Sequence, residues 1–343
     1  MVAAVLLSEL TTLHLGGPAG AVVEATTEAE LVDAVRALDT AGDASLVLAG
    51  GSNVVVADAG FAGAVVRVAT RGVAVEGARL EVAAGESWDG LVARCVADGL
   101  AGIECLSGIP GSVGATPIQN VGAYGQEVAE TITGVRALDR RSGEVATLTP
   151  SDCAFAYRSS AFKRDPGRWL VLAVTFELHP GGASAPVRYA ELARTLGVEL
   201  GDRAPLAAVR EAVLGLRRGK GMVIEPGDPD TVSAGSFFTN PILEPDAFAA
   251  FEARAGEPPP RWQEEGRVKT SAAWLIERAG FTKGYGDPDG IAISSKHTLA
   301  LTNRGAGTTA QLVALAREIA AGVHDRFGVE IVPEPVFVGH SWN

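Results

Sequence analysis

The chain has 343 residues, 47% of them hydrophobic, and its 29 basic and 41 acidic side chains give a net charge of −12. This length allows two or three domains, and so high a hydrophobic share excludes wholesale disorder. The acidic balance argues against nucleic acid or an anionic membrane surface as the main partner, although a few placed Arg and Lys residues could still bind an anionic small molecule.

Cysteine and histidine usage gives no sign of a metal site. Cys95, Cys105 and Cys153 are scattered without metal-ligand spacing, and the five histidines are equally dispersed. This usage predicts buried thiols in a reducing compartment. The N-terminus lacks a basic segment and a cleavage pattern, and no run reaches the roughly 18 apolar residues of a membrane span. We therefore expect a cytoplasmic protein with no metal and no membrane insertion.

The first 70 residues have the pattern of a β-α-β unit. Thr27 can cap a helix, and Glu30 stands three residues on, as in a capping box, ahead of apolar residues at helical spacing. The predicted elements are a helix at 27–41 and strands at 21–23, 46–48, 54–56 and 65–68.

A glycine turn follows the second of these strands, at Gly50, Gly51, Ser52 and Asn53. The end of a strand is a usual place for a phosphate, because backbone N–H groups in such a turn can face an anion. The turn is neither a G-x-G-x-x-G dinucleotide fingerprint nor a P-loop, and no helix follows it directly. A phosphate site and a plain hairpin turn both remain open.

The rest of the chain mixes short strands with helices. Residues 179–182 mark a boundary, and the Ala- and Arg-rich residues 183–217 are predicted to be mostly helical. The other predicted elements are two short strands within 73–84, a hairpin over 133–148, strands at 169–178, 298–302 and 329–332, and helices at 87–98, 246–255, 271–279 and 308–327.

Residues 108–125, the glycine loop, hold five glycines, two prolines and no formal charge. So many glycines and prolines are incompatible with a strand or a helix, and a disordered linker would be more polar. The composition predicts a loop of fixed shape that is partly buried, and buried backbone must find hydrogen-bond partners. A ligand rich in acceptors, such as a pyrophosphate or the edge of a flavin ring, would supply them, and a tight structural connection on a sheet is the alternative.

Five segments in this order resemble the UDP-N-acetylenolpyruvoylglucosamine reductase family: residues 50–53, 108–125, 157–160, 234–241 and 333–335. The resemblance covers nearly the whole chain, and it rests on the five segments together. It implies an α+β fold, with an FAD-binding fold of the vanillyl-alcohol-oxidase type, built of two α+β subdomains, and a C-terminal α+β substrate domain. The implied boundaries are 1–70 for the first subdomain, on which 330–343 can pack, 71–182 for the second, 183–217 for a substrate-loop insertion and 218–329 for the substrate domain.

The resemblance also implies the activity. It points to NADPH-dependent, FAD-mediated reduction of UDP-N-acetylglucosamine enolpyruvate to UDP-N-acetylmuramate in peptidoglycan precursor synthesis, by a monomer. FAD would be bound non-covalently, since relatives of this fold that attach flavin covalently often place a His in the first glycine turn, where this chain has Ser52 and Asn53. The alternatives are an FAD-linked oxidase or dehydrogenase of a small alcohol or hydroxy acid on the same fold, and a nucleotide-binding module without catalysis.

Three residues would carry the chemistry. Hydride transfer from reduced flavin to the alkene leaves negative charge on the α-carbon and its carboxylate, which Arg158 suits as a bidentate partner. Ser236 would be the proton donor, and Glu334, held between two prolines, would polarise the enol or donate a proton itself. Taken alone, each has a simpler interpretation: a solvated charge, a turn serine and an exposed acid, respectively.

The implied binding residues fall into two sets. Tyr189 belongs to the family type that closes a loop over the substrate diphosphate, whereas Trp262 and His297 stand where a tyrosine and a glutamine are expected. The substrate set is Tyr157, Arg158, Tyr189, Lys220, Asn240, Trp262 and His297. The FAD set is Gly50, Gly51, Ser52, Asn53, Gly108, Pro110, Gly111, Ser112, Gly114, Ala115, Gln119, Asn120, Gly122, Ala123, Tyr124 and Gly125.

Overall fold

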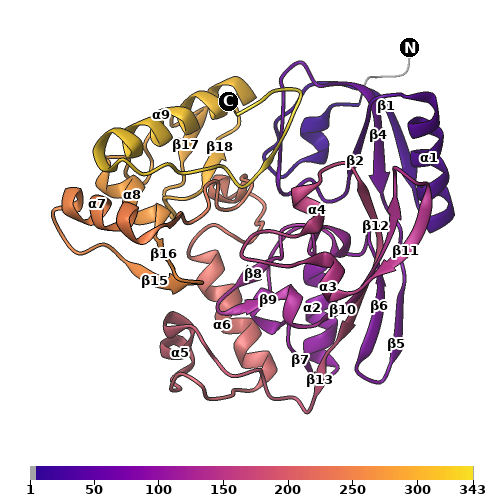
Figure 1. Ribbon diagram of the computed structural model, residues 1–343, viewed down its shortest axis with the longest axis horizontal. Coiled ribbons are helices and arrows are strands. Elements are labelled where there is room, and N and C mark those ends of the chain that lie inside the picture. The colour runs from indigo at the N-terminus through magenta and orange to yellow at the C-terminus, as the bar shows by residue number, and fades with distance from the viewer. Residues whose placement is uncertain (1–4, 343) are drawn as a thin grey trace. The chain divides into compact units, whose positions relative to one another are not determined.

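The computed structural model describes residues 5–342 (Figure 1). Within them the chain forms two compact units, and each is built from more than one stretch of sequence. Unit 1 contains residues 5–18, 51–61 and 220–342, and unit 2 contains residues 19–50 and 62–219. The two units are described separately.

Unit 2 mixes strands with six α-helices in its described residues. Its helices are α1 (Glu28–Ala41), α2 (Trp88–Ala97), α3 (Pro150–Cys153), α4 (Ala161–Arg164), α5 (Ala190–Leu196) and α6 (Leu206–Arg218). Its strands are β1 (Ala19–Ala25), β2 (Ser45–Leu48), β4 (Phe61–Val68), β5 (Val73–Glu76), β6 (Arg79–Ala83), β7 (Leu100–Ala101), β8 (Gly122–Ala123), β9 (Gln126–Glu127), β10 (Ile132–Asp139), β11 (Glu144–Leu148), β12 (Trp169–Glu177) and β13 (His179–Pro180).

The centre of unit 2 is a five-stranded antiparallel sheet in the order β11-β10-β12-β6-β5. Strand β12 lies in the middle and is buried on both sides, which explains its almost unbroken apolar sequence. Val171 and Phe176 pack with Trp88 of α2, while Leu170 and Leu172 pack in a cluster with α1. The sheet is therefore the middle layer of this unit, with hydrophobic clusters on both faces.

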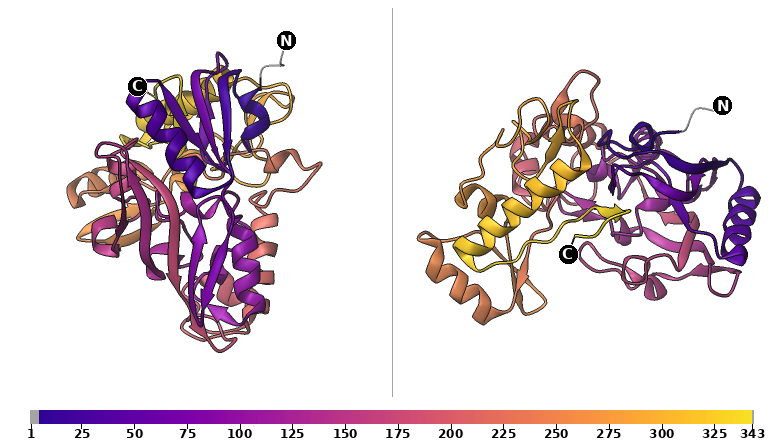
Figure 2. Two further views of the ribbon diagram at one scale, coloured as in Figure 1. Left: turned by 90° about the vertical axis from the view of Figure 1, so that its right-hand side faces the viewer. Right: turned by 90° about the horizontal axis from the view of Figure 1, so that it is seen from above.

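A second sheet, β1-β4-β2, lies beside α1 (Figure 2). Helix α1 begins with the expected capping box, in which the Thr27 side chain accepts from the Glu30 N–H, and it ends at Gly42 in a left-handed conformation. Strand β2 runs parallel to β4, whereas β3 (Val54–Val56) pairs with β19 (Val336–Val338). Because β2 and β3 do not pair, the turn at residues 50–53 is not a hairpin, and that alternative is wrong.

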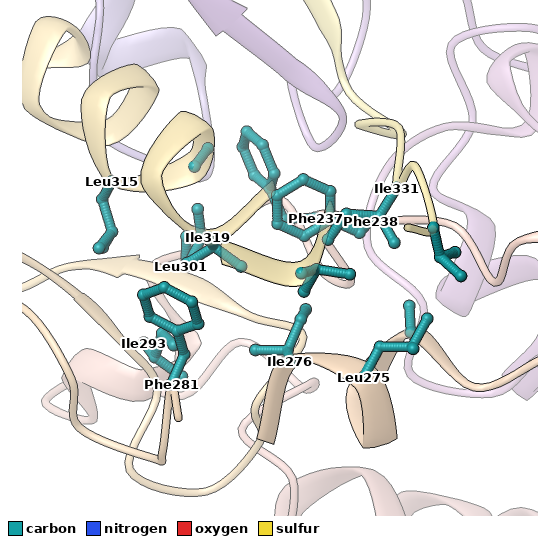
Figure 3. Close-up of a cluster of buried hydrophobic side chains, with 14 of the residues drawn as sticks. Phe237, Phe238, Leu275, Ile276, Phe281, Ile293, Leu301, Leu315, Ile319 and Ile331 are labelled. Carbon is teal, nitrogen blue, oxygen red and sulfur yellow. The ribbon is translucent and has the colours of Figure 1, made fainter. Parts of the chain in front are cut away.

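Unit 1 is organised around one long helix. Its helices are α7 (Pro245–Ala255), α8 (Ala272–Arg278) and α9 (Thr309–Phe327), and its strands are β3, β14 (Ile242–Leu243), β15 (Arg261–Glu264), β16 (Arg267–Thr270), β17 (Ile291–Ile293), β18 (Leu301–Asn303) and β19. Figure 3 shows Leu315 and Ile319 of α9 among buried side chains that include Phe237, Phe238 and Ile331. The segment around Ser236 thus rests on the main core of the unit.

Most of the predicted elements are present, and two are misplaced. The strand expected at 329–332 is not formed; β19 begins at Val336 instead. Val329 and Ile331 of the expected strand are both buried, as they would be in a strand. However, the following Pro333 and Pro335 lack the N–H groups that a continuous ladder needs. The strand expected at 298–302 starts only at Leu301, because Ala300 N–H closes a turn on the His297 carbonyl (3.1 Å). Within residues 5–342, no helix has the length and hydropathy needed to cross a membrane.

Candidate functional site

The glycine loop in unit 2 has a fixed shape because backbone hydrogen bonds hold it to the elements just before it in sequence. The N–H groups of Val113 and Gly114 donate to the carbonyls of Glu86 and Ala84 at 2.9 and 2.8 Å, and Trp88 N–H donates back to Gly111 at 3.1 Å. Its entry therefore lies against the end of β6 and the start of α2. The loop is a formed structure, as its composition predicts.

Two glycines of the FAD set are required by protein packing. A Cβ on Gly50 would lie 2.7 Å from the Gly111 Cα, so the end of β2 and the glycine loop meet backbone to backbone. A Cβ on Gly114 would lie 2.5 Å from the Ala84 Cβ. Packing within the protein alone accounts for glycine at these two positions, whether or not a ligand approaches them.

Two buried polar atoms in the loop fit a bound ligand. Ser112 is 5% exposed and Gln119 is 8% exposed, and the Ser112 Oγ and the Gln119 Oε1 find no hydrogen-bond partner among residues 5–342. A buried polar atom without a partner costs about 1–3 kcal/mol, so a ligand that bonds to both atoms would remove a penalty of the protein itself. The loop thus has the donors, acceptors and small residues that a flavin nucleotide requires.

A charged network anchors the start of the loop. The Asp89 carboxylate accepts from Gly108 N–H at 2.6 Å and from both Nη atoms of Arg210 at 2.7 and 2.9 Å, and Arg217 Nη2 donates to the Gly108 carbonyl at 3.3 Å. Burial acts to raise the pKa of Asp89, but the bonds from Arg210 and Gly108 outweigh it, and the pKa lies below its ordinary value. Both backbone groups of Gly108 are therefore fixed by side chains of α2 and α6, which lie close together in Figure 1.

Arg158 sits in a strained turn against the far end of the loop. Ala156 and Ser159 exchange backbone hydrogen bonds at 3.0 and 3.1 Å around Tyr157 and Arg158, and Arg158 has a φ of 50°. Its Nη2 donates to the Gly122 carbonyl at 2.6 Å, and its guanidinium lies 5.3 Å from the centre of the Tyr157 ring. A positive φ is uncommon for a non-glycine residue, and the contact to Gly122 fixes the direction of this cation.

Tyr189 also reaches the glycine loop. It precedes α5, is 43% exposed, and makes an edge-on contact with Tyr124 at 5.4 Å between ring centres. The neighbouring Arg188 pairs with Glu130 at 3.0 Å, and a Cβ on Gly125 would lie 2.9 Å from the Arg188 Cβ. The segment that carries Tyr189 is thus seated on residues 124–130, with an aromatic ring left accessible to a ligand.

In unit 1, Ser236 and Glu334 come from segments that pair with each other. Glu334 N–H donates to the Phe237 carbonyl at 2.8 Å, and Thr239 N–H donates to the Val332 carbonyl at 3.1 Å. We call residues 236–239 together with 332–334 the serine–glutamate junction. The side chains of Ser236 and Glu334 are partly exposed, while Phe237 and Phe238 are buried beneath them. The structure thus places on adjacent segments two residues to which the family resemblance assigns roles in the chemistry.

The first glycine turn continues into the same neighbourhood of unit 1. Val336 N–H donates to the Asn53 carbonyl at 2.9 Å, and β19 then runs parallel to β3. Glu334 therefore stands two residues before the contact with Asn53. Gly51, Ser52 and Asn53 belong to unit 1, while Gly50 and the glycine loop belong to unit 2.

The remaining substrate candidates of unit 1 lie on four separate features. Asn240 Oδ1 accepts from Ala272 N–H at the start of α8 (3.0 Å), and Trp262 is 51% exposed on β15, opposite Lys269. Lys220 begins the third stretch of sequence in unit 1, next to Gly221, and His297 lies in the turn before β18. The side-chain oxygen of Asn240 thus already accepts a hydrogen bond within the protein, whereas about half of Trp262 is exposed to solvent.

Sequence reasoning did not identify Asp89, Arg210 or Arg217 as part of the loop environment. Asp89 looks like an ordinary acid in the first turn of a helix, and the two arginines are spaced seven apart on α6, which places them on one face. That spacing was a usable signal, but nothing local shows that this face meets the glycine loop.

Comparison with known proteins adds an independent line of evidence. Residues 19–149 match the model of an FAD binding domain, and residues 228–338 match that of the UDP-N-acetylenolpyruvoylglucosamine reductase C-terminal domain. The chain is 61% identical to UDP-N-acetylenolpyruvoylglucosamine reductase of Streptomyces coelicolor, over 97% of this chain and 89% of that protein. It is 56% identical to the enzyme of the same name from Thermobifida fusca, over 97% and 96% of the two chains.

A solved structure supports the fold. The crystal structure of UDP-N-acetylenolpyruvylglucosamine reductase from Thermus caldophilus matches with a TM-score of 0.66 at 24% identity, over 98% of this chain and 99% of that one. An α+β protein with an FAD-binding domain of the vanillyl-alcohol-oxidase type and a C-terminal domain of the reductase type is therefore confirmed.

Proposed function

This chain belongs to the UDP-N-acetylenolpyruvoylglucosamine reductase family, and from that premise we propose which of its residues carry the reaction. It is a UDP-N-acetylmuramate dehydrogenase of peptidoglycan precursor synthesis, with FAD and NADPH as cofactors and a UDP-sugar as substrate. The alternatives of an oxidase on the same fold and of a non-catalytic module are thereby excluded. When bound, FAD passes reducing equivalents from NADPH to the double bond of the enolpyruvyl group.

The FAD set is proposed to bind without a covalent bond, because Ser52 and Asn53 occupy the first glycine turn. Ser112 and Gln119 supply hydrogen-bonding atoms that lack protein partners among residues 5–342. The residues of the glycine loop and of the first glycine turn would bind the diphosphate and the flavin ring through backbone N–H groups. The bonds of Asp89 and Arg217 to Gly108 support this role, because they fix the loop before any ligand arrives.

Arg158 is proposed to bind the substrate carboxylate. Negative charge grows on that carboxylate and on the α-carbon during reduction, and a guanidinium with a fixed direction stabilises such charge more than a mobile one. The bond from Arg158 to the Gly122 carbonyl and the strained turn that carries it support this assignment. Tyr157 would contribute the ring surface beneath the cation.

Ser236 and Glu334 are proposed to act as a pair, with a proton passing from Ser236 Oγ to the α-carbon. The observation that carries this proposal is the hydrogen bond from Glu334 N–H to the Phe237 carbonyl, which keeps the two residues on adjacent segments. A serine hydroxyl is a weak acid, so a nearby carboxylate that orders the hydroxyl and the substrate is a reasonable partner. The buried Phe237 and Phe238 would limit access of water from below.

The remaining substrate residues are assigned by chemistry. Lys220 is proposed to neutralise the substrate diphosphate or the developing charge, and Tyr189 to close over the diphosphate as in the family type with a substrate-loop tyrosine. Asn240 and His297 would hydrogen-bond the substrate, and Trp262 would stack on it. We further propose that the protein acts as a monomer in the cytoplasm, without nucleic acid, and that residues 183–217 and 218–329 work as the substrate loop and the substrate domain.

The test is NADPH oxidation at varied UDP-N-acetylglucosamine enolpyruvate, with Arg158→Met and, as a control, Arg141→Met, whose partner Asp165 lies on the surface. We expect oxidation to require the sugar nucleotide and Arg158→Met to lower kcat/KM about 10- to 100-fold, the loss expected for a charged hydrogen-bond pair. An unchanged kcat/KM in Arg158→Met, or an equal loss in Arg141→Met, would contradict the role given to Arg158.

A further inference from the structure

Asp230 is a buried carboxylate in unit 1 to which the sequence and the proposed mechanism give no role. It is 3% exposed and follows Pro229 in a short 3-10 turn. Its Oδ1 accepts from Ser295 N–H at 2.8 Å and from Arg304 Nη2 at 3.0 Å, and the Ser295 hydroxyl donates to its Oδ2 at 2.5 Å. A buried charge needs this many partners to be tolerated, so the site is built to keep Asp230 ionised.

Three segments that carry proposed site residues meet at this residue. The turn that contains Lys220 packs against the backbone of Asp230, because a Cβ on Gly221 would lie 2.9 Å from the Asp230 carbonyl oxygen and 3.1 Å from its Cβ. The loop that contains His297 is held through Ser295. The third segment is that of Asp230 itself, which runs on to Ser236 along β18, where Asn303 N–H donates to the Val232 carbonyl at 3.0 Å.

The electrostatics of the site agree with this geometry. Burial acts to raise the pKa of Asp230, but hydrogen bonds from Ser295 and the charge of Arg304 outweigh it, and its pKa lies below the ordinary value. The carboxylate is therefore charged at neutral pH. Two residues earlier, the pair of Asp228 and Lys296 is considerably more exposed than that of Asp230 and Arg304.

We propose that Asp230 is a positioning residue for the substrate site: paired with Arg304, it holds the Lys220 turn, the His297 loop and the segment leading to Ser236 in one arrangement. This inference rests on the proposed function. A sub-ångström to 1 Å displacement of binding groups is enough to change affinity and rate by one to two orders of magnitude, so loss of the carboxylate should be felt at the substrate.

The test measures flavin content, the Kd for UDP-N-acetylglucosamine enolpyruvate by perturbation of the flavin spectrum, and KM, in FAD-loaded Asp230→Asn and Asp228→Asn. We expect Asp230→Asn to keep its flavin and to raise Kd and KM about 10-fold or more, and Asp228→Asn, which retains an acceptor for Asp230 N–H, to match wild type. If Asp230→Asn does not fold, Ser295→Ala, which leaves the ion pair intact, should still raise Kd, by a smaller factor.

A folded Asp230→Asn or Ser295→Ala variant with wild-type Kd and KM would overturn the inference, as would an equal rise in Asp228→Asn, which would indicate general loosening of the segment. Failure of the wild-type protein to bind the sugar nucleotide would instead overturn the proposed function, so the two failures are distinguishable. Combining Asp230→Asn with Arg304→Gln removes both charges, and we expect its Kd to rise no further than in Asp230→Asn, because the two residues act as one unit.

Discussion

In unit 2, the glycine loop takes its shape from neighbours in the sequence: its N–H groups bond to the end of β6 and its Gly111 carbonyl accepts from the start of α2. In unit 1, Ser236 and Glu334 are far apart in the sequence and meet only because residues 237–239 and 332–334 exchange backbone hydrogen bonds. The first part of the glycine loop is thus held largely by local bonds, and the side chains of Arg210 and Arg217 add more distant contacts at Asp89 and Gly108. The serine–glutamate junction depends on the fold of the whole of unit 1, and its proposed chemistry is carried by the side chains of Ser236 and Glu334.

The largest effect is expected for Glu334→Gln. The side chain changes while the backbone bond from Glu334 to the Phe237 carbonyl remains, so the junction should keep its shape. We expect reoxidation of the NADPH-reduced enzyme by substrate to slow by about 10²- to 10⁴-fold, the usual cost of losing a proton-transfer partner, with flavin reduction unaffected. Stopped-flow absorbance of each half-reaction measures this, with the exposed Glu330→Gln as the matched control; wild-type reoxidation in Glu334→Gln would remove Glu334 from the mechanism.

The second prediction is that the free energy of unfolding of unit 2 depends on pH through its buried thiols. All three cysteines lie in unit 2, and burial raises the pKa of the Cys95 thiol to about 12, that of Cys153 to about 11, and that of Cys105 further still. The native thiols keep their protons above pH 8.5 while the unfolded chain loses them, so the free energy of unfolding falls as pH rises through that window, by at most about 1.4 kcal/mol per pH unit and thiol.

Denaturant unfolding at pH 8 to 10.5, followed by tryptophan fluorescence and by thiol reactivity toward a disulfide reagent, measures this loss. We expect the thiols to react only as unit 2 opens, and Cys153→Ala to make the pH dependence shallower. Rapid labelling of the native protein at pH 8 would contradict the burial of these residues.

The smallest effect is expected for Asp89→Asn, which weakens the anchor of the glycine loop. Asp89 is partly exposed, so the loss should be about 1 kcal/mol, or roughly a fivefold weaker affinity for FAD. Because the pKa of Asp89 is lowered in the fold, its stabilising contribution is present above pH 4 and is lost as pH falls through the native value, and Asp89→Asn should reduce this acid sensitivity. Equilibrium FAD titration tests this, with Asp98→Asn, at the other end of α2, as the control. A change in the reoxidation rate at saturating FAD would contradict the separation of the glycine loop from the serine–glutamate junction.

The same contrast explains what the sequence could reveal. The glycine loop, the helix cap at Thr27 and the hairpin at 133–148 are encoded by neighbouring residues, and all are formed. Asp89 and Asp230 could not be found in this way, because each acquires its role from partners on other elements, Arg210 in one case and Arg304 in the other. The strand expected at 329–332 is not formed although Val329 and Ile331 are both buried, because Pro333 and Pro335, which follow it, lack the N–H groups that a continuous ladder needs.

The pairing of Ser236 with Glu334 is the central claim, and Ser236→Ala tests it most directly. The rate constant for reoxidation of the reduced flavin by UDP-N-acetylglucosamine enolpyruvate is compared between wild type, Ser236→Ala and Ser271→Ala, whose hydroxyl caps α8 in the same unit. We predict that reoxidation in Ser236→Ala falls at least about 10²-fold while NADPH still reduces the flavin at the wild-type rate, and that Ser271→Ala reoxidises normally. Reoxidation of Ser236→Ala at the wild-type rate would contradict the account.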